Sequence, residues 1–450
     1  MAIRFSRGQN IVIFWFVLLF LISTAVRVIF ILASHPGIQN DSPSYITLAH
    51  EISQLNLAND NGFRTPVYPL FILLLNFDPI LIRIGQTILG LLILSSMYWI
   101  SWHFTKNILI AFFAGALYGL NLAQIYFESN ILTETLATFF VVTSVFIFII
   151  GIEKENQKRY IIWMLGSGFL GGLAALTRPL YLFVPFLLAL INILIINKNR
   201  LLNRIKYSLL LFLPAFLLIG GWSLYNYFRL GYFGPTTFTG YGLADHSITF
   251  INYAPEQFAK IRDVYLALQV REGTNVINVW DGFTEMEQVT GESFVKLSKT
   301  LTQMSLYLFV HHPILYAQSI VFTWIKFWNE PGWWTWPFVY SEKIQLIIAY
   351  AWRIEKYFLV ILQNTPFLLL IALSSILTVI KKSPQLVWKS KPIITMTLVV
   401  LVTSFVQAIM ERGDVTRYGV PVQPLIACVL LISIVQIITD RKSTLIRGKK

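Results

Sequence analysis

A lone acid, Asp41, follows the first long apolar run of the chain, in the stretch IQNDSPSYITLAH. Tyr45 stands four residues later, at the beginning of a segment whose pattern predicts a helix over 43–56. An ionised carboxylate in this place could act as a general base that takes a proton from a reacting hydroxyl. It could equally do no more than cap the predicted helix by accepting hydrogen bonds from its first backbone amides.

Arginines stand in three other polar connections between apolar runs. Arg64 lies in RTPVYP, where two prolines favour an extended or turned backbone. Arg178 lies in TRPLY, and Arg417 lies beside Tyr418 in ERGDVTRYGVPVQP. A planar guanidinium group suits two-pronged binding of a phosphate or a carboxylate. Segments far apart in the sequence therefore supply groups that could bind an anion together.

Two glutamates, Glu128 and Glu134, lie in the stretch YFESNILTE. Six residues along a helix span about 9 Å, so both acids can belong to one small site only if the helix breaks between them. Glu128 could be a solvated loop acid, whereas Glu134 lies in an apolar context where an unpaired carboxylate is costly. For Arg27 and Arg412, at the ends of apolar runs, we expect guanidinium groups that extend to the lipid headgroups.

The composition excludes a soluble protein. The 450 residues are 56% hydrophobic and 13% charged, whereas about a quarter of a soluble domain is charged. Repeated apolar runs of about 20 residues predict an all-α polytopic membrane protein. The net charge of +13 does not indicate nucleic-acid binding, because the basic residues cluster in short connections where they act as topology signals. With a single cysteine, Cys428, a disulfide is excluded.

The first apolar run has no convincing small-residue cleavage site, so we predict an uncleaved first span. About ten membrane-spanning helices are expected, with boundaries good to a few residues, over 11–32, 79–103, 108–123, 131–152, 160–177, 179–197, 207–228, 357–380, 392–410 and 420–438.

The basic clusters determine the predicted orientation. If the number of spans is even, all clusters fall on one side, which the positive-inside rule assigns to the cytoplasm. Both termini are then cytoplasmic, in a multi-pass protein of the cell (inner) membrane. The clusters begin at Arg4, Lys106, Lys154, Lys198, Lys381 and Arg441.

This orientation leaves two long segments outside, 33–78 and 229–356, which we expect to form a cap on the bundle. The chain then divides into an N-terminal transmembrane module (1–228), the outer segment 229–356, and C-terminal transmembrane helices with a cytoplasmic tail (357–450). The apolar stretch 311–328 is predicted to lie along the outer membrane surface as an interfacial helix, with a re-entrant helix as the alternative.

No motif in the sequence indicates a bound nucleotide or a bound metal. HExxH, a phosphate-binding glycine loop and a nucleophilic serine elbow are all absent from it. A metal site using Asp41 and His246 is possible, but no spacing supports it. We therefore predict no metal-binding residues and no certain cofactor, and leave a divalent cation open.

The ordered set of motifs resembles the GT-C superfamily of lipid-dependent glycosyltransferases. It is most similar to the branch of protein O-mannosyltransferases and lipid A aminoarabinose transferases. The similar motifs run along nearly the whole chain, in the order DSPSY, RTPVYPLF, LTET, TRPLY, WSLYNYFRLGYFGPTTFTGYGL, HHP and RYGVPVQP.

The resemblance implies a GT-C fold of about ten transmembrane helices with extracytoplasmic amphipathic helices. It also implies catalytic roles for Asp41 and Glu134. Many members carry Asp-Glu in the first outer loop, where this chain has Asp41-Ser42, so a single acid stands here. Donor-phosphate binding would fall to Arg64, Arg178, Arg417 and Tyr418, and substrate binding to Tyr45, Tyr68, Glu128 and His246.

The implied activity is transfer of a sugar from a polyprenyl-phosphate donor to a hydroxyl of an extracytoplasmic glycan, lipid or protein. Asp41 would be the general base, and the anomeric carbon would be inverted. Alternatives from other classes are a multi-pass transporter, a flippase for a lipid-linked sugar, or a polysaccharide polymerase or ligase. The sequence identifies neither the sugar nor the acceptor, the lipid length or the oligomeric state.

Overall fold

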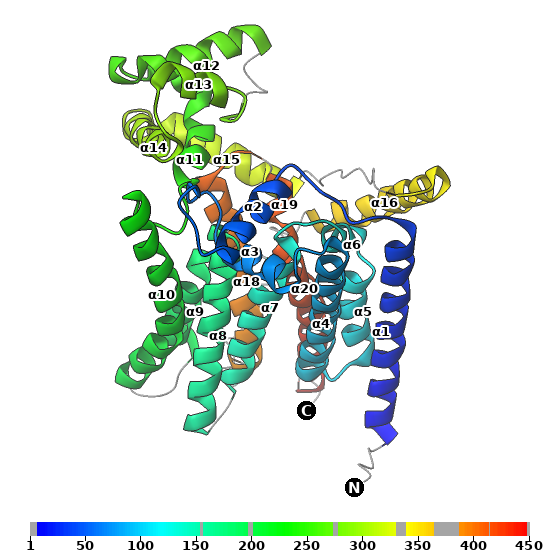
Figure 1. Cartoon of the computed structure of the whole chain (residues 1–450). Coiled ribbons are helices and arrows are strands. Elements are labelled where there is room, and N and C mark those ends of the chain that lie inside the picture. Colours follow the sequence, from blue (N-terminus) through cyan, green and yellow to red (C-terminus); the bar gives the residue numbers. More distant parts are fainter. Residues whose placement is uncertain are drawn as a thin grey trace.

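The computed structural model describes residues 7–153, 156–196, 201–272, 278–329, 339–363, 387–413 and 415–447. These residues form a bundle of helices with a helical cap at one end (Figure 1). The described part contains no extended strand and only two isolated bridges, Ser34 with Val339 and Gly37 with Asn130. The predicted all-α architecture is confirmed.

Six described helices are long and apolar enough to cross a membrane, or up to eight elements if each of two bent pairs forms one span. The six are α1 (Arg7–Ala33), α4 (Pro79–Thr105), α7 (Glu134–Gly151), α8 (Gln157–Thr177), α10 (Leu201–Leu230) and α18 (Val387–Met410). The bent pairs are α5 (Ile108–Gly119) with α6 (Leu122–Ser129), at 45°, and α14 (Phe294–His311) with α15 (Pro313–Asn329), at 107°. Two further apolar helices are shorter, around α9 (Phe183–Ile191) and in the first part of α20 (Gln423–Arg447).

Apart from the pair of α14 and α15, for which no span was predicted, these helices coincide with predicted spans. One predicted span, at 357–380, has no counterpart among them. That one begins within α16 (Glu342–Gln363) and otherwise lies outside the described residues. The helix α16 also continues through the boundary expected at 356. The prediction of a polytopic membrane protein is confirmed by the described helices, while the count of ten stays a prediction.

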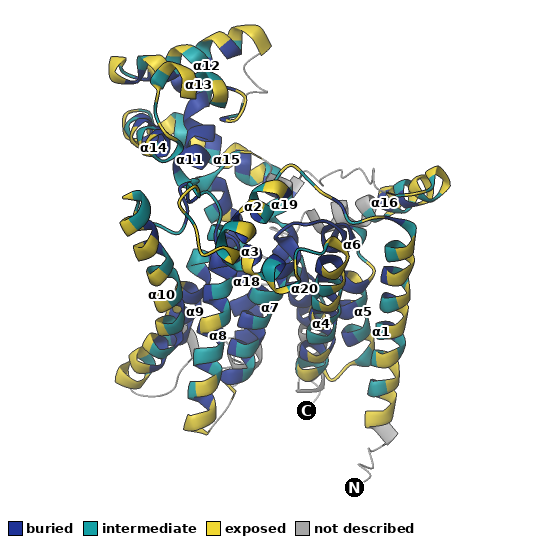
Figure 2. Ribbon diagram, in the orientation of Figure 1, coloured by how far each residue is buried: buried dark blue, intermediate teal, exposed yellow. Residues whose placement is uncertain are grey.

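Large apolar side chains cover the outside of the bundle. On α1, Phe14 and Ile29 are more than half exposed, and on α10 the same holds for Leu209 and Phe216. Figure 2 shows α1 and α10 with many exposed residues, whereas α7 between them is mostly buried. Apolar surfaces of this extent are costly in water and are the normal outside of a lipid-facing bundle.

The two ends of the bundle differ. The start of α1 and the end of α20 lie at the lower end in Figure 1, as an even number of crossings requires. The upper end carries α2 (Ser42–Ser53), α3 (Val67–Leu74) and the short helix α19 (Val415–Tyr418). Above them sits the cap, which contains α11 (Thr239–Ser247), α12 (Ala259–Glu272), α13 (Phe283–Thr290) and α14. This cap has an apolar core of its own around Tyr241, Tyr265, Met286 and Leu301.

The segment 34–78, between α1 and α4, is the predicted first outer loop. Its start is bound to the bundle. The amide of Gly37 donates to Ser129 O (2.9 Å), and the amide of Ile131 donates to Gly37 O (3.0 Å). Ser42 Oγ adds a bond to Ile131 O (2.9 Å). These bonds hold the beginning of α2 against the break between α6 and α7.

The middle of the same loop, around residues 57–62, is bound to the end of α10. Arg229 binds the carbonyls of Leu57 and Asp60 and the Asp60 carboxylate. Gly62 has φ +72°, and a Cβ there would meet Leu230 Cδ1 at 2.7 Å. Only glycine adopts this backbone without strain at such close approach. The loop that carries Asp41 and Arg64 is therefore held at both sides.

Helix α15 lies against the upper part of α18. Tyr316 donates its hydroxyl proton to Ile409 O (3.0 Å), and Trp324 Nε1 donates to Ser404 Oγ (3.0 Å). The sharp bend between α14 and α15 falls at His312, just before Pro313, which cannot continue a helix from the residue before it. The predicted place of α15 along the membrane surface stays a prediction.

Topology is tested by thiol labelling of a variant in which Cys428 is replaced by alanine. Cysteines introduced for the exposed Gln54 and Gln257, at the cap end, should react with a membrane-impermeant maleimide in intact spheroplasts. A cysteine introduced for the exposed Gln157, at the opposite end, should react only after permeabilisation. The reverse pattern would invert the orientation.

Candidate functional site

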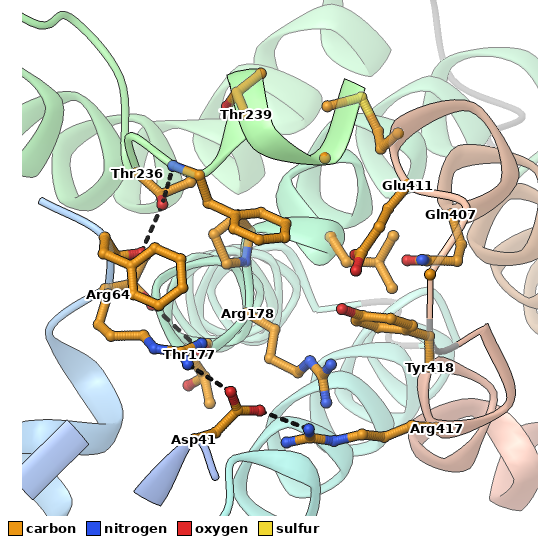
Figure 3. Close-up of a pocket in the computed structure, with 18 of the residues that line it drawn as sticks. Asp41, Arg64, Thr177, Arg178, Thr236, Thr239, Gln407, Glu411, Arg417 and Tyr418 are labelled. Atoms are coloured by element: carbon orange, nitrogen blue, oxygen red, sulfur yellow. Dashed lines mark hydrogen bonds and ion pairs between the residues drawn. The ribbon is translucent and has the colours of Figure 1, made fainter. Parts of the chain in front are cut away.

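A cavity of about 760 Å³ lies at the upper end of the bundle, between the first outer loop, α11 and the segment that joins α18 to α20. It collects six of the predicted site residues from three distant parts of the chain, which are Asp41, Tyr45 and Arg64, then Arg178, and then Arg417 and Tyr418. Figure 3 shows Asp41 between Arg64 and Arg417, with Arg178 beside them.

Asp41 occupies the N-cap position of α2, but its side chain makes no capping hydrogen bond. Instead, Oδ1 accepts from Arg64 Nη2 at 2.7 Å and Oδ2 accepts from Arg417 Nη1 at 2.6 Å. Burial would raise the pKa of Asp41, but the charges of Arg64 and Arg417 outweigh it and lower the pKa to about 2. The carboxylate is thus ionised and points into the cavity rather than along its helix.

Arg64 is held in place by a polar and an aromatic set of contacts. Its Nε donates to Ser44 Oγ (2.8 Å), and its Nη1 donates to the hydroxyl of Tyr45 (3.1 Å). The guanidinium also lies over the rings of Tyr45 and Phe63, at 4.4 and 4.1 Å from the centroids. Tyr45, a predicted substrate-binding residue, therefore lines the cavity as a support for Arg64.

Glu134 lies behind the cavity wall and does not line it. Its carboxylate is fully buried, and Oε1 accepts from Arg178 Nη1 at 2.6 Å and from Arg417 Nε. One glutamate thus fixes two arginines that come from the α8–α9 connection and from α19. In this structure Glu134 is a positioning residue for the arginines, since it does not reach the cavity itself.

Local breaks in the helices place these groups. Arg178 ends α8 in an extended conformation because Pro179 follows it. Glu134 begins α7 after an irregular stretch that separates it from α6. The chain thus breaks between Glu128 and Glu134, as a shared site would require, but the two acids turn to different partners.

Tyr418 connects the arginine cluster to a second group of polar residues. Arg178 lies over its ring, 4.5 Å from the centroid, and its hydroxyl lies beside the carboxylate of Glu411. In Figure 3, Glu411 and Gln407 lie on one side of the Tyr418 ring, and Asp41 and Arg417 lie on the other. The cavity therefore has a basic end and an acidic end.

The charges at the basic end do not cancel. Arg64, Arg178 and Arg417 face two carboxylates, Asp41 and Glu134, so one positive charge is left without a counter-charge in this group. Three guanidinium groups in a partly buried hollow suit a phosphate, which accepts several charge-assisted hydrogen bonds.

Glu128 lies elsewhere in the bundle. Its carboxylate forms a two-pronged ion pair with Arg27, with both N–O distances at 2.7 Å. Arg27 is 1% exposed and also donates to Gly119 O (2.7 Å). A Cβ on Gly90 would lie 2.1 Å from Glu128 Oε1, so this glycine makes room for the acid. The expectation that Arg27 extends to the headgroups is wrong, because a buried partner on another helix outcompetes the membrane surface.

Tyr68 and His246 are also away from the cavity lining. Tyr68 is fully buried and donates its hydroxyl proton to Gln86 Oε1 (3.0 Å). His246 Nδ1 lies 2.8 Å from Ser319 Oγ, and burial, with the charge of Arg412, lowers the pKa of His246 to about 3. Neither side chain lines the cavity, so the contact with substrate that was predicted for Tyr68 and His246 is not possible from these positions.

The sequence did not single out three polar residues at the acidic end, Asp245, Glu411 and Gln407. A signal existed for two of them. Asp245 is the only acid of a small, glycine-containing helix, and Glu411 belongs to the motif that carries Arg417. Asp414 of that motif lies outside the described residues. Among those that are described, no group of three His, Cys, Asp or Glu side chains could hold a metal ion.

Comparisons with known proteins give one remote similarity. No protein-family model matches the chain, and no curated protein matches it. Among solved structures, ArnT from Cupriavidus metallidurans bound to undecaprenyl phosphate is similar over 88% of this chain and 77% of that chain, with 11% identity and a TM-score of 0.36. A likeness of this size transfers neither an activity nor the role of any residue to this chain.

The Arg27–Glu128 pair provides a stability prediction. Glu128→Gln should destabilise the protein by about 3 kcal/mol, because it leaves a buried guanidinium without its counter-charge. The double variant Arg27→Met, Glu128→Gln should be more stable than Glu128→Gln, since both charges are gone. Thermal unfolding in detergent measures both. A Glu128→Gln variant of unchanged stability and impaired substrate binding would instead support the substrate-binding role predicted from the sequence.

Proposed function

We propose that this protein is a membrane glycosyltransferase that moves a sugar from a polyprenyl-phosphate donor to an acceptor hydroxyl outside the cytoplasm. The observation that carries the proposal is the convergence of Arg64, Arg178 and Arg417 on one cavity beside the carboxylate of Asp41. The cavity lies at the end of an apolar bundle, where the phosphate of a membrane lipid is located. A lipid-linked donor needs no nucleotide-binding loop, and the sequence has none.

The arginines account for the leaving group. In the reaction, the bond between the anomeric carbon and the phosphate oxygen breaks, and the electron pair leaves with the polyprenyl phosphate. The second negative charge that develops on this phosphate is stabilised by guanidinium groups that are already fixed in position. Glu134 fixes two of them from behind, so little reorganisation is needed during the step.

Asp41 is the proton acceptor. The acceptor hydroxyl gives its proton to the carboxylate while its oxygen forms a bond to the anomeric carbon on the face opposite the phosphate, with inversion. In the structure, both oxygens of Asp41 bind arginines, and its low pKa makes it a weak base. A bound phosphate competes for Arg64 and Arg417 and adds a negative charge nearby, and both effects raise the pKa of Asp41. Donor binding thereby activates the base.

The position of the charges argues against a transporter. A transporter binds its substrate near the middle of the membrane, in a site that opens to each side in turn. Here the three arginines belong to the outer loop, the α8–α9 connection and α19, all at one end of the bundle. A polymerase or ligase is distinguished by its product. It would change the length of a glycan chain, whereas the proposed enzyme adds a single sugar residue to its acceptor.

The proposal is tested first in cells. Deletion of the gene should remove the mass increment of one sugar residue from a cell-surface glycan, lipid or protein, as detected by mass spectrometry. The wild-type gene should restore it. Unchanged surface glycans, or altered transport of a small solute, would contradict the proposal.

Asp41→Asn should lower transfer at least about 100-fold, because it removes the proton acceptor but keeps the shape of the side chain. Purified protein in detergent, a synthetic polyprenyl-phosphate sugar and the acceptor found in cells provide the assay. The variant should still bind undecaprenyl phosphate, since the arginines remain. Full turnover by Asp41→Asn would exclude Asp41 as the base.

The pH dependence follows from the shift in the pKa of Asp41. The acid acts in its ionised form, so activity is lost as the pH falls through its pKa. The pKa is about 2 in the free protein and higher in the donor complex. The acidic limb of kcat should therefore lie at higher pH than the limb of kcat/KM, because kcat reports the complex. Limbs at the same pH would show that the donor does not compete for the arginines.

A further inference from the structure

The acidic end of the cavity is formed by residues that converge on Gly413. A Cβ placed there would lie 3.2 Å from Glu411 Oε1 and 3.4 Å from Asp245 Oδ2. The two carboxyl groups, from α11 and from the end of α18, thus approach the same point although 166 residues separate them in sequence. Both line the cavity.

Two polar groups at this end are buried without a full set of partners. Asp245 is 4% exposed, and the one hydrogen bond to it among the described residues runs from the amide of Val279 to Oδ1 (2.8 Å). Gln407 is 2% exposed and lines the cavity, and its Nε2 has no hydrogen-bond partner within the described part of the chain. Its amide points to the cavity beside Glu411 (Figure 3). Buried polar groups without partners are rare in proteins and indicate a missing ligand or water.

The acidic end adjoins the basic end across Tyr418. Arg178 lies over the Tyr418 ring, 4.5 Å from its centroid, and the carboxylate of Glu411 lies beside the hydroxyl of the same side chain. Both groups line one cavity of about 760 Å³, so a sugar ring and the phosphate attached to it can contact both. Nearby, Trp280 lines the cavity and stacks on Tyr241, with ring centroids 5.1 Å apart.

We propose that Asp245, Glu411 and Gln407 form the subsite for the sugar ring of the donor and bind its neutral hydroxyl groups. This inference rests on the proposed function, because it assigns the phosphate of the same donor to the arginines. It names the substrate class as a lipid-linked sugar recognised through hydroxyls rather than through a charge.

The chemistry of the three residues fits hydroxyl groups. A hydroxyl both donates and accepts, so its site must offer both. Burial and the nearby charge of Glu411 raise the pKa of Asp245 to about 8, and it therefore keeps a proton near neutral pH and can donate. Gln407 Nε2 also donates, and a carboxylate accepts. An ammonium group would use acceptors only, and a metal ion would need more ligands than this group supplies.

The experiment measures the contribution of the sugar to donor binding. The purified full chain in detergent is titrated by native mass spectrometry with undecaprenyl phosphate, and with undecaprenyl phosphate that carries glucose, mannose or glucosamine. At least one neutral sugar should tighten binding about tenfold or more over the bare lipid, as expected from two hydrogen bonds of ordinary strength.

Variants then assign this gain. Asp245→Leu, which removes both the donor and the acceptor, and Gln407→Met should each reduce the gain about threefold, and should leave the affinity for bare undecaprenyl phosphate within twofold of wild type. Arg178→Lys, the matched control at the other end, should weaken all the lipids by the same factor. If Asp245→Leu lowers the unfolding temperature strongly, Gln407→Met, which keeps the length of the side chain, decides alone.

The inference is overturned by any of the following outcomes: the gain survives in both variants, the variants weaken the bare lipid as much as the sugar-bearing lipids, or no neutral sugar tightens binding. A glucosamine preference of tenfold or more would also overturn it and would identify an ammonium site. Failure of the proposed function has a different signature, because Arg178→Lys would then leave the affinity for bare undecaprenyl phosphate unchanged.

Discussion

The buried carboxylate of Glu134 is the interaction on which the cavity depends. It lies at the first residue of α7, has no exposed surface and binds both Arg178 and Arg417. Such a group is costly unless charges oppose it, and removing one partner of a buried pair typically costs about 3–5 kcal/mol. The acid therefore requires that the α8–α9 connection and α19 meet above α7. Their meeting sets the floor of the cavity and leaves one face of each arginine for another anion.

The same arrangement gives Arg417 two carboxylate partners. It binds Glu134 behind the cavity wall and Asp41 at the cavity side. Asp41 is about one third exposed, whereas Glu134 is fully buried. In the proposed reaction, the donor phosphate would therefore compete more readily with Asp41 than with Glu134 for Arg417. The arginines would stay in place while the proposed proton acceptor is freed.

Local signals in the sequence were sufficient for the apolar helices that the structure describes and for the arginines that line the cavity. Hydropathy is a property of each segment alone, and an arginine before Pro179, in a connection predicted to lie outside, has no use as a topology signal. The pairing of Arg27 with Glu128 was not predictable in this way, because it depends on how two helices cross and on the space left by Gly90. Asp245 was missed for a similar reason. On its own helix it resembles a solvated acid, and it is buried where Val279 and the segment 410–413 approach it from other parts of the chain.

The two ends of the cavity also explain the size and place of the cap. The basic end is built almost wholly from connections between spans, which the bundle fixes by itself. The acidic end needs α11, whose position depends on the separate apolar core of the cap and on the tie between Tyr316 and α18. Changes within the cap can therefore alter the acidic end without moving the arginines. The proposed phosphate site and the proposed sugar subsite therefore lie on parts of the fold that are fixed separately, and this separation follows from the fold rather than from any single residue.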